Sequence, residues 1–188
     1  MPEMGTANEL EATRELPDLY YTGETEMRCL AETIRHVWDR GHAHHIERLM
    51  VQSNFALIYG ASPQELNEWF HFGFVDAYHW VTTPNVIGMG VFGTPVLSSK
   101  PYASSGSYID RMSDYCSQCR YDVDETTGEN ACPFNALYWD FLDRNDDLRE
   151  NHRMGLVYHN WDERDEETRE TIRERASEIR TKIESGRA

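Results

Sequence analysis

Lysine is almost absent from this chain: only two of its eighteen basic residues are lysine, and the rest are arginine. Acidic residues number 33, so the formal net charge is −15. A carboxylate-rich surface with little lysine is typical of proteins that stay dissolved in concentrated salt, where ions screen the repulsion. We therefore expect a halophilic source. The same charge argues against nonspecific nucleic-acid binding at low salt, but a local docking face is compatible with it.

Long apolar runs are missing as well. No stretch of eighteen or more apolar residues occurs, so we expect no membrane span. The N-terminal MPEMGTANELEATRELP is acidic and has no apolar core, unlike a secretory signal, so we expect a cytoplasmic protein. At 188 residues the chain is long enough for one domain with a substantial hydrophobic core.

Cysteine is scarce, but its pattern is informative: Cys29 stands alone, and Cys116, Cys119 and Cys132 follow with the spacing C-x2-C-x12-C-P. Four thiolates form the shell of structural zinc and of 4Fe-4S clusters alike. Unliganded buried thiols and two disulfides are the alternatives, and a reducing compartment disfavours the disulfides. The spacing does not decide between metals, although the solitary first ligand and the final proline favour a cluster.

Hydrophobic periodicity predicts an all-α protein, since no alternating strand pattern and no internal repeat occur. A helix is expected after Thr22, ending at Gly41. Ser62 and Pro63 have the residue types of an N-cap and a first helical position. We expect the remaining helices over 43–59, 63–72, 74–84, 107–115, 133–143 and 162–185. Gly60 should cap the end of the first of these, Pro84 should end the helix over 74–84, and an irregular loop is expected over 85–106.

Three segments are expected along the chain. Residues 1–22 have the composition of an irregular lead-in, and 23–160 hold all four cysteines and every predicted helix except the last. Residues 161–188 form a charged helix with few apolar positions, for which a solvated surface position is the simplest interpretation.

Several blocks resemble the iron–sulfur bacterial cryptochromes and prokaryotic (6-4) photolyases, within the photolyase/cryptochrome superfamily. They lie between about residues 8 and 160 and read LPDLYYTGETEMRCL, HHIERLMVQSNFALIYG, NEWFHFGFVDAYHWVTTPNVIGM, SKPYASSGSYIDRMSDYCSQCRYD and ACPFNALYWDFLDRN. The resemblance implies the C-terminal part of the helical FAD-binding domain, with a 4Fe-4S cluster on the four cysteines. It also implies light-driven repair of pyrimidine (6-4) photoproducts in UV-damaged DNA, or photosensing as a cryptochrome.

The resemblance also implies roles for individual residues near the flavin. Adjacent histidines near a helix start could be caps or solvent-facing, but histidine also suits proton transfer near neutral pH. By resemblance His45 is the catalytic proton donor beside the flavin and His44 supports it. Arg48 and Asp76 resemble the ion pair beside the flavin ring, for which an ordinary salt bridge between helices is the alternative. Thr82 takes the position opposite flavin N5, where relatives often have an acidic or amide residue.

Two further residues are assigned by resemblance. Trp69 corresponds to the tryptophan that passes an electron to photoexcited flavin. Tyr21 and Phe70 depart from the family pattern of tryptophan and tyrosine, so the electron route beyond Trp69 is open. Tyr102 resembles a residue at the lesion pocket, with Lys100 and the loop around it on the side facing DNA. Most aromatic residues of any chain are core packing, and a plain surface loop is the alternative for this segment.

Family proteins are much longer than this chain. No βαβ pattern of an antenna domain and no Gly-rich phosphate loop occurs in the sequence. We therefore expect weak FAD binding by this chain alone, and a missing or separately encoded N-terminal half as a partner. The alternative function is a stand-alone helical module in which the four cysteines bind a metal for a structural or interaction role, without catalysis.

Overall fold

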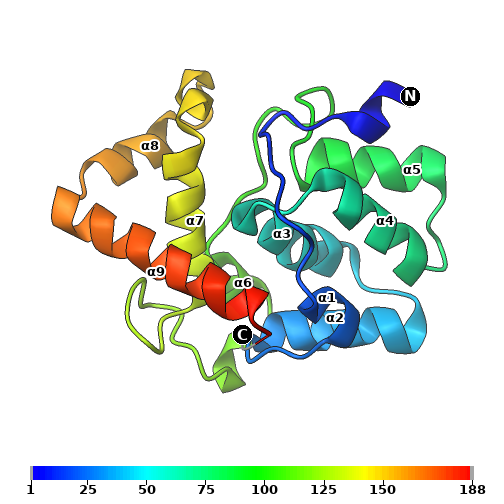
Figure 1. Cartoon of the computed structure of the whole chain (residues 1–188), viewed down its shortest axis with the longest axis horizontal. Helices are drawn as coiled ribbons and strands as arrows, with labels where there is room; N and C mark the ends of the chain where they lie inside the picture. Colours follow the sequence, from blue (N-terminus) through cyan, green and yellow to red (C-terminus); the bar gives the residue numbers. More distant parts are fainter. Residues whose placement is uncertain (1, 187–188) are drawn as a thin grey trace.

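The computed structural model describes residues 2–186 and is built from helices around one hydrophobic core (Figure 1). Residues 1, 187 and 188, which belong to the first and last predicted segments, lie outside the described residues. The elements are 3-10 helix η1 (Pro2–Thr6), α1 (Leu19–Thr22), α2 (Arg28–Arg40), π-helix η2 (Glu47–Ser53), α3 (Asn54–Tyr59), α4 (Pro63–Gly73), α5 (His79–Thr83), π-helix η3 (Pro84–Gly90), α6 (Gly106–Met112), 3-10 helix η4 (Cys116–Gln118), α7 (Pro133–Arg144), 3-10 helix η5 (Asp146–Glu150), α8 (Gly155–Asp162) and α9 (Glu166–Glu184).

The predicted all-α class is confirmed for the described part of the chain, where the β-structure consists of isolated bridges outside any named strand. None of the helices in residues 2–186 is both long and apolar enough to cross a membrane.

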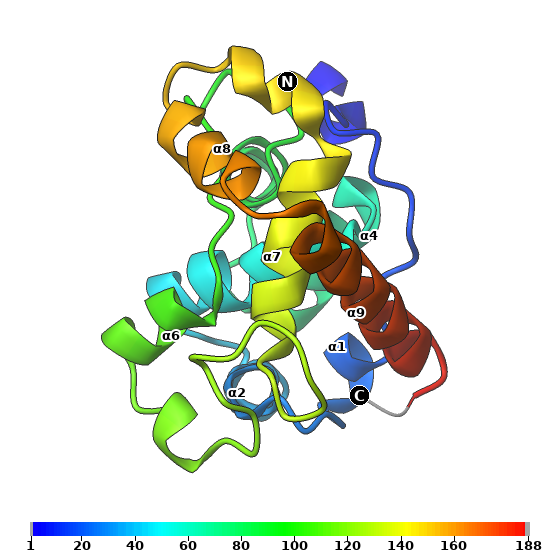
Figure 2. The same cartoon turned by 90° about the vertical axis from the view of Figure 1, so that its left-hand side faces the viewer.

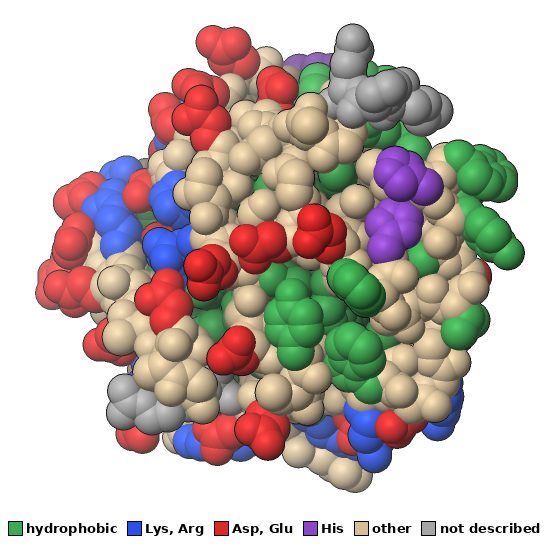
Figure 3. All heavy atoms as spheres, turned by 45° about the vertical axis from the view of Figure 1, so that its right-hand side comes forward, with side chains coloured by type: hydrophobic (Ala, Val, Ile, Leu, Met, Phe, Trp, Pro, Cys, Tyr) green, Lys and Arg blue, Asp and Glu red, His purple; other side chains and the backbone are tan. Residues whose placement is uncertain are grey.

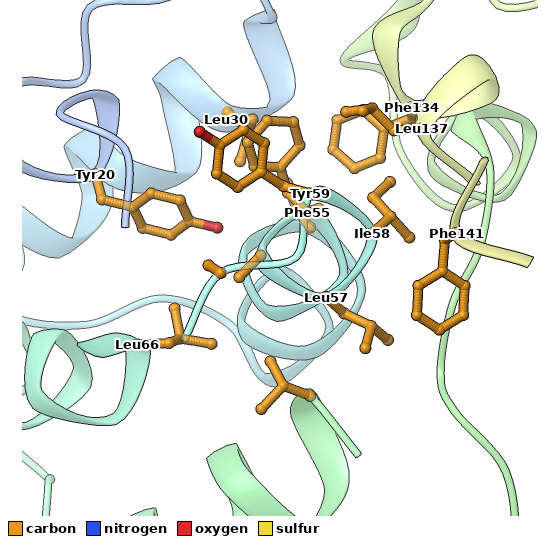
Figure 4. Close-up of a cluster of buried hydrophobic side chains, with 14 of the residues drawn as sticks. Tyr20, Leu30, Phe55, Leu57, Ile58, Tyr59, Leu66, Phe134, Leu137 and Phe141 are labelled. Atoms are coloured by element: carbon orange, nitrogen blue, oxygen red, sulfur yellow. The ribbon is translucent and has the colours of Figure 1, made fainter. Parts of the chain in front are cut away.

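Helix α3 lies at the centre of the molecule. All six of its residues are buried, which is typical of a helix surrounded on every side by protein. Phe55 packs against the rings of Tyr20, Tyr59 and Phe134, with centroid distances of 6.4, 6.0 and 5.3 Å. Figure 4 shows α3 side chains directed toward α7 on one side and toward α1 on the other. The neighbouring helices are therefore positioned by their contact with α3.

Several predicted helix ends are confirmed. Gly41 and Gly60 end α2 and α3 in the left-handed region, with φ of 62° and 92°, where glycine avoids the penalty of a Cβ. Ser62 accepts a hydrogen bond from the Glu65 backbone N–H, and Pro63 takes the first position of α4. These signals work because they depend on local backbone chemistry alone.

Two stretches differ from the prediction of plain α-helix. The expected helix over 43–59 is a π-helix, η2, that continues into α3. The expected helix over 74–84 begins only at His79, and Pro84 does not end it. Pro84 instead occupies the first position of π-helix η3, where its missing N–H costs least. The predicted loop over 85–106 is therefore helical up to Gly90.

The two π-helices pack against each other. A Cβ on Gly90 in η3 would lie 2.9 Å from the Ser53 Oγ of η2, so a glycine is required for this close approach. A π-helical segment widens the backbone ladder and is found frequently at functional sites. Here the pair brings residues of η2 face to face with residues of α5 and η3.

The C-terminal part is more tightly packed than its composition indicates. Helix α8, which the sequence pattern did not predict, packs on α7. Helix α9 crosses α7 in Figure 2 and buries one side, including Ile172, Ile179 and Ile183. Arg180 of α9 and Arg144 of α7 both donate to the buried Asp140 carboxylate. The charged helix is thus solvated on one side only, because regularly spaced isoleucines and a paired arginine face α7.

Candidate functional site

A pocket of about 210 Å³ lies between the π-helices and α5, and it brings together all four residues expected around a flavin ring: His45, Arg48, Asp76 and Thr82. These residues come from separate parts of the chain and meet only through the packing of η2 against η3. The remaining wall contains Ser53 and Asn85 and is otherwise apolar, from Leu49, Phe70, Val81, Val86 and Met89. Such a pocket offers apolar surface to a flat ring and a few polar groups to fix its orientation.

The expected contact between Arg48 and Asp76 is present and bidentate. Arg48 Nη1 and Nη2 donate to the two Asp76 carboxylate oxygens at 3.0 and 2.9 Å. Arg48 Nε donates to the Ala43 carbonyl at 2.8 Å, and the guanidinium lies 4.2 Å from the Phe74 ring centroid. The hydrogen bonds from Arg48 hold the pKa of Asp76 below its usual range. The arginine is thereby fixed in one position, and the carboxylate stays ionised at the pocket edge.

The two adjacent histidines face different cavities. His45 is exposed and lines the pocket with Arg48. His44 lines a second cavity of about 190 Å³, next to Glu47 and Tyr115. The structure therefore does not bring His44 into the pocket with His45, and any support from His44 acts through the backbone that the two share.

Tyr102 lies outside the residues that line the pocket. It is 38% exposed, in the irregular segment that follows η3, and Lys100 in the same segment is exposed as well. The buried Asn54 of α3 anchors this segment, because its amide donates to the Ser104 carbonyl and accepts from the Ser104 N–H, both at 3.0 Å. The segment thus has a fixed base and an exposed tip.

Trp69 is buried behind the pocket wall. Its ring lies 5.3 Å from that of Phe70, which lines the pocket. On the other side Trp38 lies 6.2 Å away, and both indole N–H groups donate to the Tyr20 carbonyl, at 2.7 and 2.9 Å. Trp38 is 44% exposed. Two neighbouring indoles thus connect the region behind the pocket to solvent, and sequence spacing alone could not have shown that Trp38 is the neighbour.

All four cysteines line one small cavity between α2, η4 and α7. Its other walls are mostly apolar, from residues such as Met27, Ile109 and Phe134. A Cβ on Gly106 would lie 2.7 Å from the Cys132 Sγ, so this glycine leaves the thiol its space. Among the described residues, however, no group of three or more His, Cys, Asp or Glu side chains is arranged to hold a metal ion. The four-cysteine cluster stays a prediction.

The cysteines influence each other's protonation. Burial, together with the other three thiols, raises the pKa of Cys29 well above its ordinary value. Burial raises the pKa of Cys116 to about 11 and that of Cys132 to about 12. Cys132 is also the N-cap of α7, where the backbone N–H groups of Phe134 and Asn135 favour a thiolate. A bound cation would reverse the effect of burial on all four groups.

Comparison with known proteins gives two informative matches. The chain is 47% identical over 185 residues, 97% of its length, to a (6-4) photolyase of Agrobacterium fabrum. It is 30% identical over 99 residues to an uncharacterized protein of Acanthamoeba polyphaga mimivirus, covering 52% of this chain and 73% of that protein. No family model matches the chain. The chain spans about a third, 36%, of the length of the photolyase it matches.

Replacing Asp76 with asparagine should lower stability in a pH-dependent way. Because the pKa of Asp76 is lowered in the folded state, its pairing stabilises the fold above the ordinary carboxyl pKa of about 3.9. That contribution is lost as pH falls through the lower folded value. We expect a loss of about 1 kcal/mol at pH 7, since Asp76 is half exposed and solvent screens the pair. Urea unfolding at pH 7 and at pH 3 measures it.

The matched control is Asp39→Asn, an exposed carboxylate on α2 for which the described residues provide no salt-bridge partner. It should change stability little at either pH. An Asp76→Asn defect that persists undiminished at pH 3 would contradict the ionic origin of the effect.

Proposed function

This chain belongs to the photolyase family, and we propose that it carries the part of an FAD-dependent (6-4) photolyase that surrounds the reacting end of the flavin. The observation that supports this is the pocket in which His45, Arg48, Asp76 and Thr82 meet. Identity of 47% along nearly the whole chain to a (6-4) photolyase supports the choice of reaction. The substrate would be a pyrimidine (6-4) photoproduct in UV-damaged DNA.

The pocket residues fit a flavin ring. The Asp76 carboxylate, oriented by Arg48, is an acceptor for an imide N–H at the polar edge of such a ring. Thr82 supplies a hydroxyl from α5, and Leu49 and Met89 supply apolar surface for the ring faces. When bound, FAD would absorb light and supply an electron to the lesion. The chain's own contribution is to fix the ring and to keep a charged carboxylate at its edge.

His45 is the residue proposed to hold the proton for the lesion. It lines the same pocket as the Arg48–Asp76 pair and is open to solvent, so a flipped-out base can reach it. Histidine exchanges protons near neutral pH, as a donor to a reduced lesion must. Tyr102 and Lys100 lie in the exposed segment anchored by Asn54, and we assign this segment to contact with DNA. Tyr102 then contacts the damaged strand near the pocket, not the flavin.

Trp69 and Trp38 are assigned to flavin photoreduction. Indole is among the side chains most easily oxidised, and the two rings lie 6.2 Å apart between centroids. Phenylalanine at position 70 cannot carry the oxidised state, so the route runs through Trp69 to Trp38. Because Trp38 is partly exposed, an external reductant can restore it.

The four cysteines are assigned to a 4Fe-4S cluster that connects α2, η4 and α7. The thiols line one mostly apolar cavity, and the match to the (6-4) photolyase extends over 97% of the chain. These elements otherwise contact one another mainly through apolar side chains, and a cluster would add bonds between its iron atoms and the cysteine thiolates. Its role is structural, since it would hold Cys29 of α2 against the segment from Cys116 to Cys132.

Further polypeptide is proposed to complete the flavin site. The side of the molecule carrying α4 and α5, turned forward in Figure 3, exposes hydrophobic side chains. Phe72, Val75, Tyr78 and Trp80 are each more than 60% exposed, directly beside pocket residues Asp76 and Val81. Apolar patches of this kind mark interaction sites. The 64% of the photolyase relative that this chain does not span is the natural source of the covering segment and of groups that bind the FAD phosphates.

FAD titration tests the pocket directly. We expect weak binding by this chain alone and tighter binding when the remaining part of the photolyase relative is supplied as a separate polypeptide. Asp76→Asn should weaken binding about tenfold, the effect of losing one charge-assisted hydrogen bond. Isothermal titration and flavin fluorescence measure both.

The matched control is Asp143→Asn, which removes an equivalent bidentate pair with Arg173 on the opposite side of the molecule. It should leave the FAD affinity unchanged. Absence of binding even with the remaining polypeptide present would refute the flavin assignment and favour the alternative of a stand-alone cysteine module.

Two substitutions separate the light-driven steps. His45→Asn should lower blue-light repair of an oligonucleotide containing a (6-4) photoproduct by at least about 100-fold, because the proton donor is lost. Trp69→Phe should slow photoreduction of the bound flavin, followed by its absorption spectrum. Trp139→Phe, which removes an indole stacked on Trp161 far from the pocket, is the control. Full flavin loading of the wild-type protein without any repair would indicate a photosensor instead.

Metal and sulfide analysis tests the cysteine assignment. Anaerobically purified protein should contain about four iron and four sulfide per chain. Cys132→Ser should lower both, while Ser117→Ala, between Cys116 and Cys119, should keep both. A content of one zinc per chain without sulfide would indicate a zinc site in place of the cluster. A protein without any metal would indicate four unliganded thiols.

A further inference from the structure

The Glu47 carboxylate lies between the histidine pair and the cysteine segment. Its Oε1 accepts a 2.6 Å hydrogen bond from the Tyr115 hydroxyl, and its Oε2 accepts one of 2.8 Å from the backbone N–H of His44. His36 Nδ1 lies 3.4 Å from Oε1. The Glu47 side chain therefore joins the start of the His44–His45 segment to Tyr115 and to His36 of α2.

Tyr115 is attached directly to the cysteine segment. It precedes Cys116, and its carbonyl accepts a 3.5 Å hydrogen bond from Arg28, which precedes Cys29. Tyr115 lines both the cysteine cavity and the 190 Å³ cavity next to His44. Tyr115 therefore lies between the two cavities, together with Ile109, and its hydroxyl donates to Glu47, which lines the second cavity.

Glu47 is also the first residue of π-helix η2, immediately before Arg48. Burial alone would raise the pKa of Glu47, but hydrogen bonds from Tyr115 and the His44 N–H, together with the nearby His36, hold that pKa below its ordinary value. The carboxylate is therefore ionised, and hydrogen bonds to an ionised acceptor are about twice as strong as neutral ones. Such bonds can fix the backbone from which His45 and Arg48 project.

We propose that Tyr115 and Glu47 are positioning residues that transmit the order of the cysteine segment to the backbone of residues 44–48, and so to the flavin pocket. The inference rests on the proposed function for the roles of the cysteines and the pocket. Neither residue lines the pocket of His45 and Arg48, so both act through the backbone. A cysteine segment that becomes loose would move Tyr115, release the Glu47 carboxylate and loosen the histidine pair.

A simpler role for the same contacts is local capping. The Glu47 carboxylate accepts a hydrogen bond from the backbone N–H of His44, three residues earlier, as in a capping box. Such a contact stabilises the start of a helix without any help from other segments. Capping requires Glu47 but neither the Tyr115 hydroxyl nor an intact cysteine segment. The two roles therefore give different results when Tyr115 is changed and when the cysteine segment is disturbed.

The experiment is hydrogen–deuterium exchange by mass spectrometry on the full chain. Tyr115→Phe should speed amide exchange in residues 42–53 about tenfold, the effect of losing a hydrogen bond to a charged group, with α9 unchanged. Tyr108→Phe is the matched control, because Tyr108 lines the same cavity and no hydrogen bond from its hydroxyl is present among the described residues. Glu47→Gln, which keeps an acceptor, should give a smaller increase and serves if Tyr115→Phe unfolds.

Removal of iron with a chelator under anaerobic conditions forms the second arm. It should speed exchange in residues 42–53 of the wild-type protein but add little in Tyr115→Phe, because the connection is already broken. Equal effects of Tyr115→Phe and Tyr108→Phe, or an equal effect of iron removal in both proteins, would overturn the proposal. If the purified protein contains no iron, the metal analysis refutes the cluster assignment separately. The comparison of Tyr115→Phe with Tyr108→Phe then tests the connection between the cysteine segment and residues 44–48 on its own.

Discussion

The arrangement of this molecule depends on the burial of α3. A helix whose side chains are buried on every side requires neighbours all around it, and these are α1 on one side and α7 on another (Figure 4). Because η2 runs directly into α3, the burial of Phe55 and Ile58 also determines where Arg48 projects. Asn54, at the start of α3, holds the exposed segment at Ser104. One buried helix thus positions the pocket and the segment assigned to DNA contact.

The pocket forms beside this buried helix because of the two π-helices, η2 and η3. A regular α-helix over 43–59 would place successive side chains 100° apart, whereas the wider π-helical turn changes which residues share a face. Because Gly90 has no side chain, the backbone of the second π-helix can lie directly against the Ser53 side chain of the first. Arg48 then reaches Asp76, which lies in the turn before α5. The pocket is the space that remains beside this contact.

The family resemblance named His45, Arg48, Asp76 and Thr82 as candidates for one site, but the sequence could not show how they are arranged. Gly41, Gly60 and the Ser62–Pro63 start are read correctly because each acts on its own backbone. The π-helices are missed because their apolar positions fit an α-helical pattern equally well, and Pro84 is misread because a proline is tolerated where a new helical turn begins. Contacts such as Trp38 with Trp69, or Tyr115 with Glu47, depend on tertiary packing and leave no signal in spacing.

The strong negative charge of the chain bears on how the proposed site can accept DNA. The pocket itself does not share that charge, because its acidic group, Asp76, is paired with Arg48 and its other titratable member is His45. Other acidic side chains lie away from the pocket, for example where Arg173 of α9 pairs with Asp143 of α7 and with Glu166 and Glu170 of α9 itself. In the proposed complex, a phosphate backbone at the pocket would meet an acidic group that is already paired, with Lys100 two residues before Tyr102 in the segment assigned to DNA contact. Binding there would rely on base contacts and on screening by salt more than on long-range attraction.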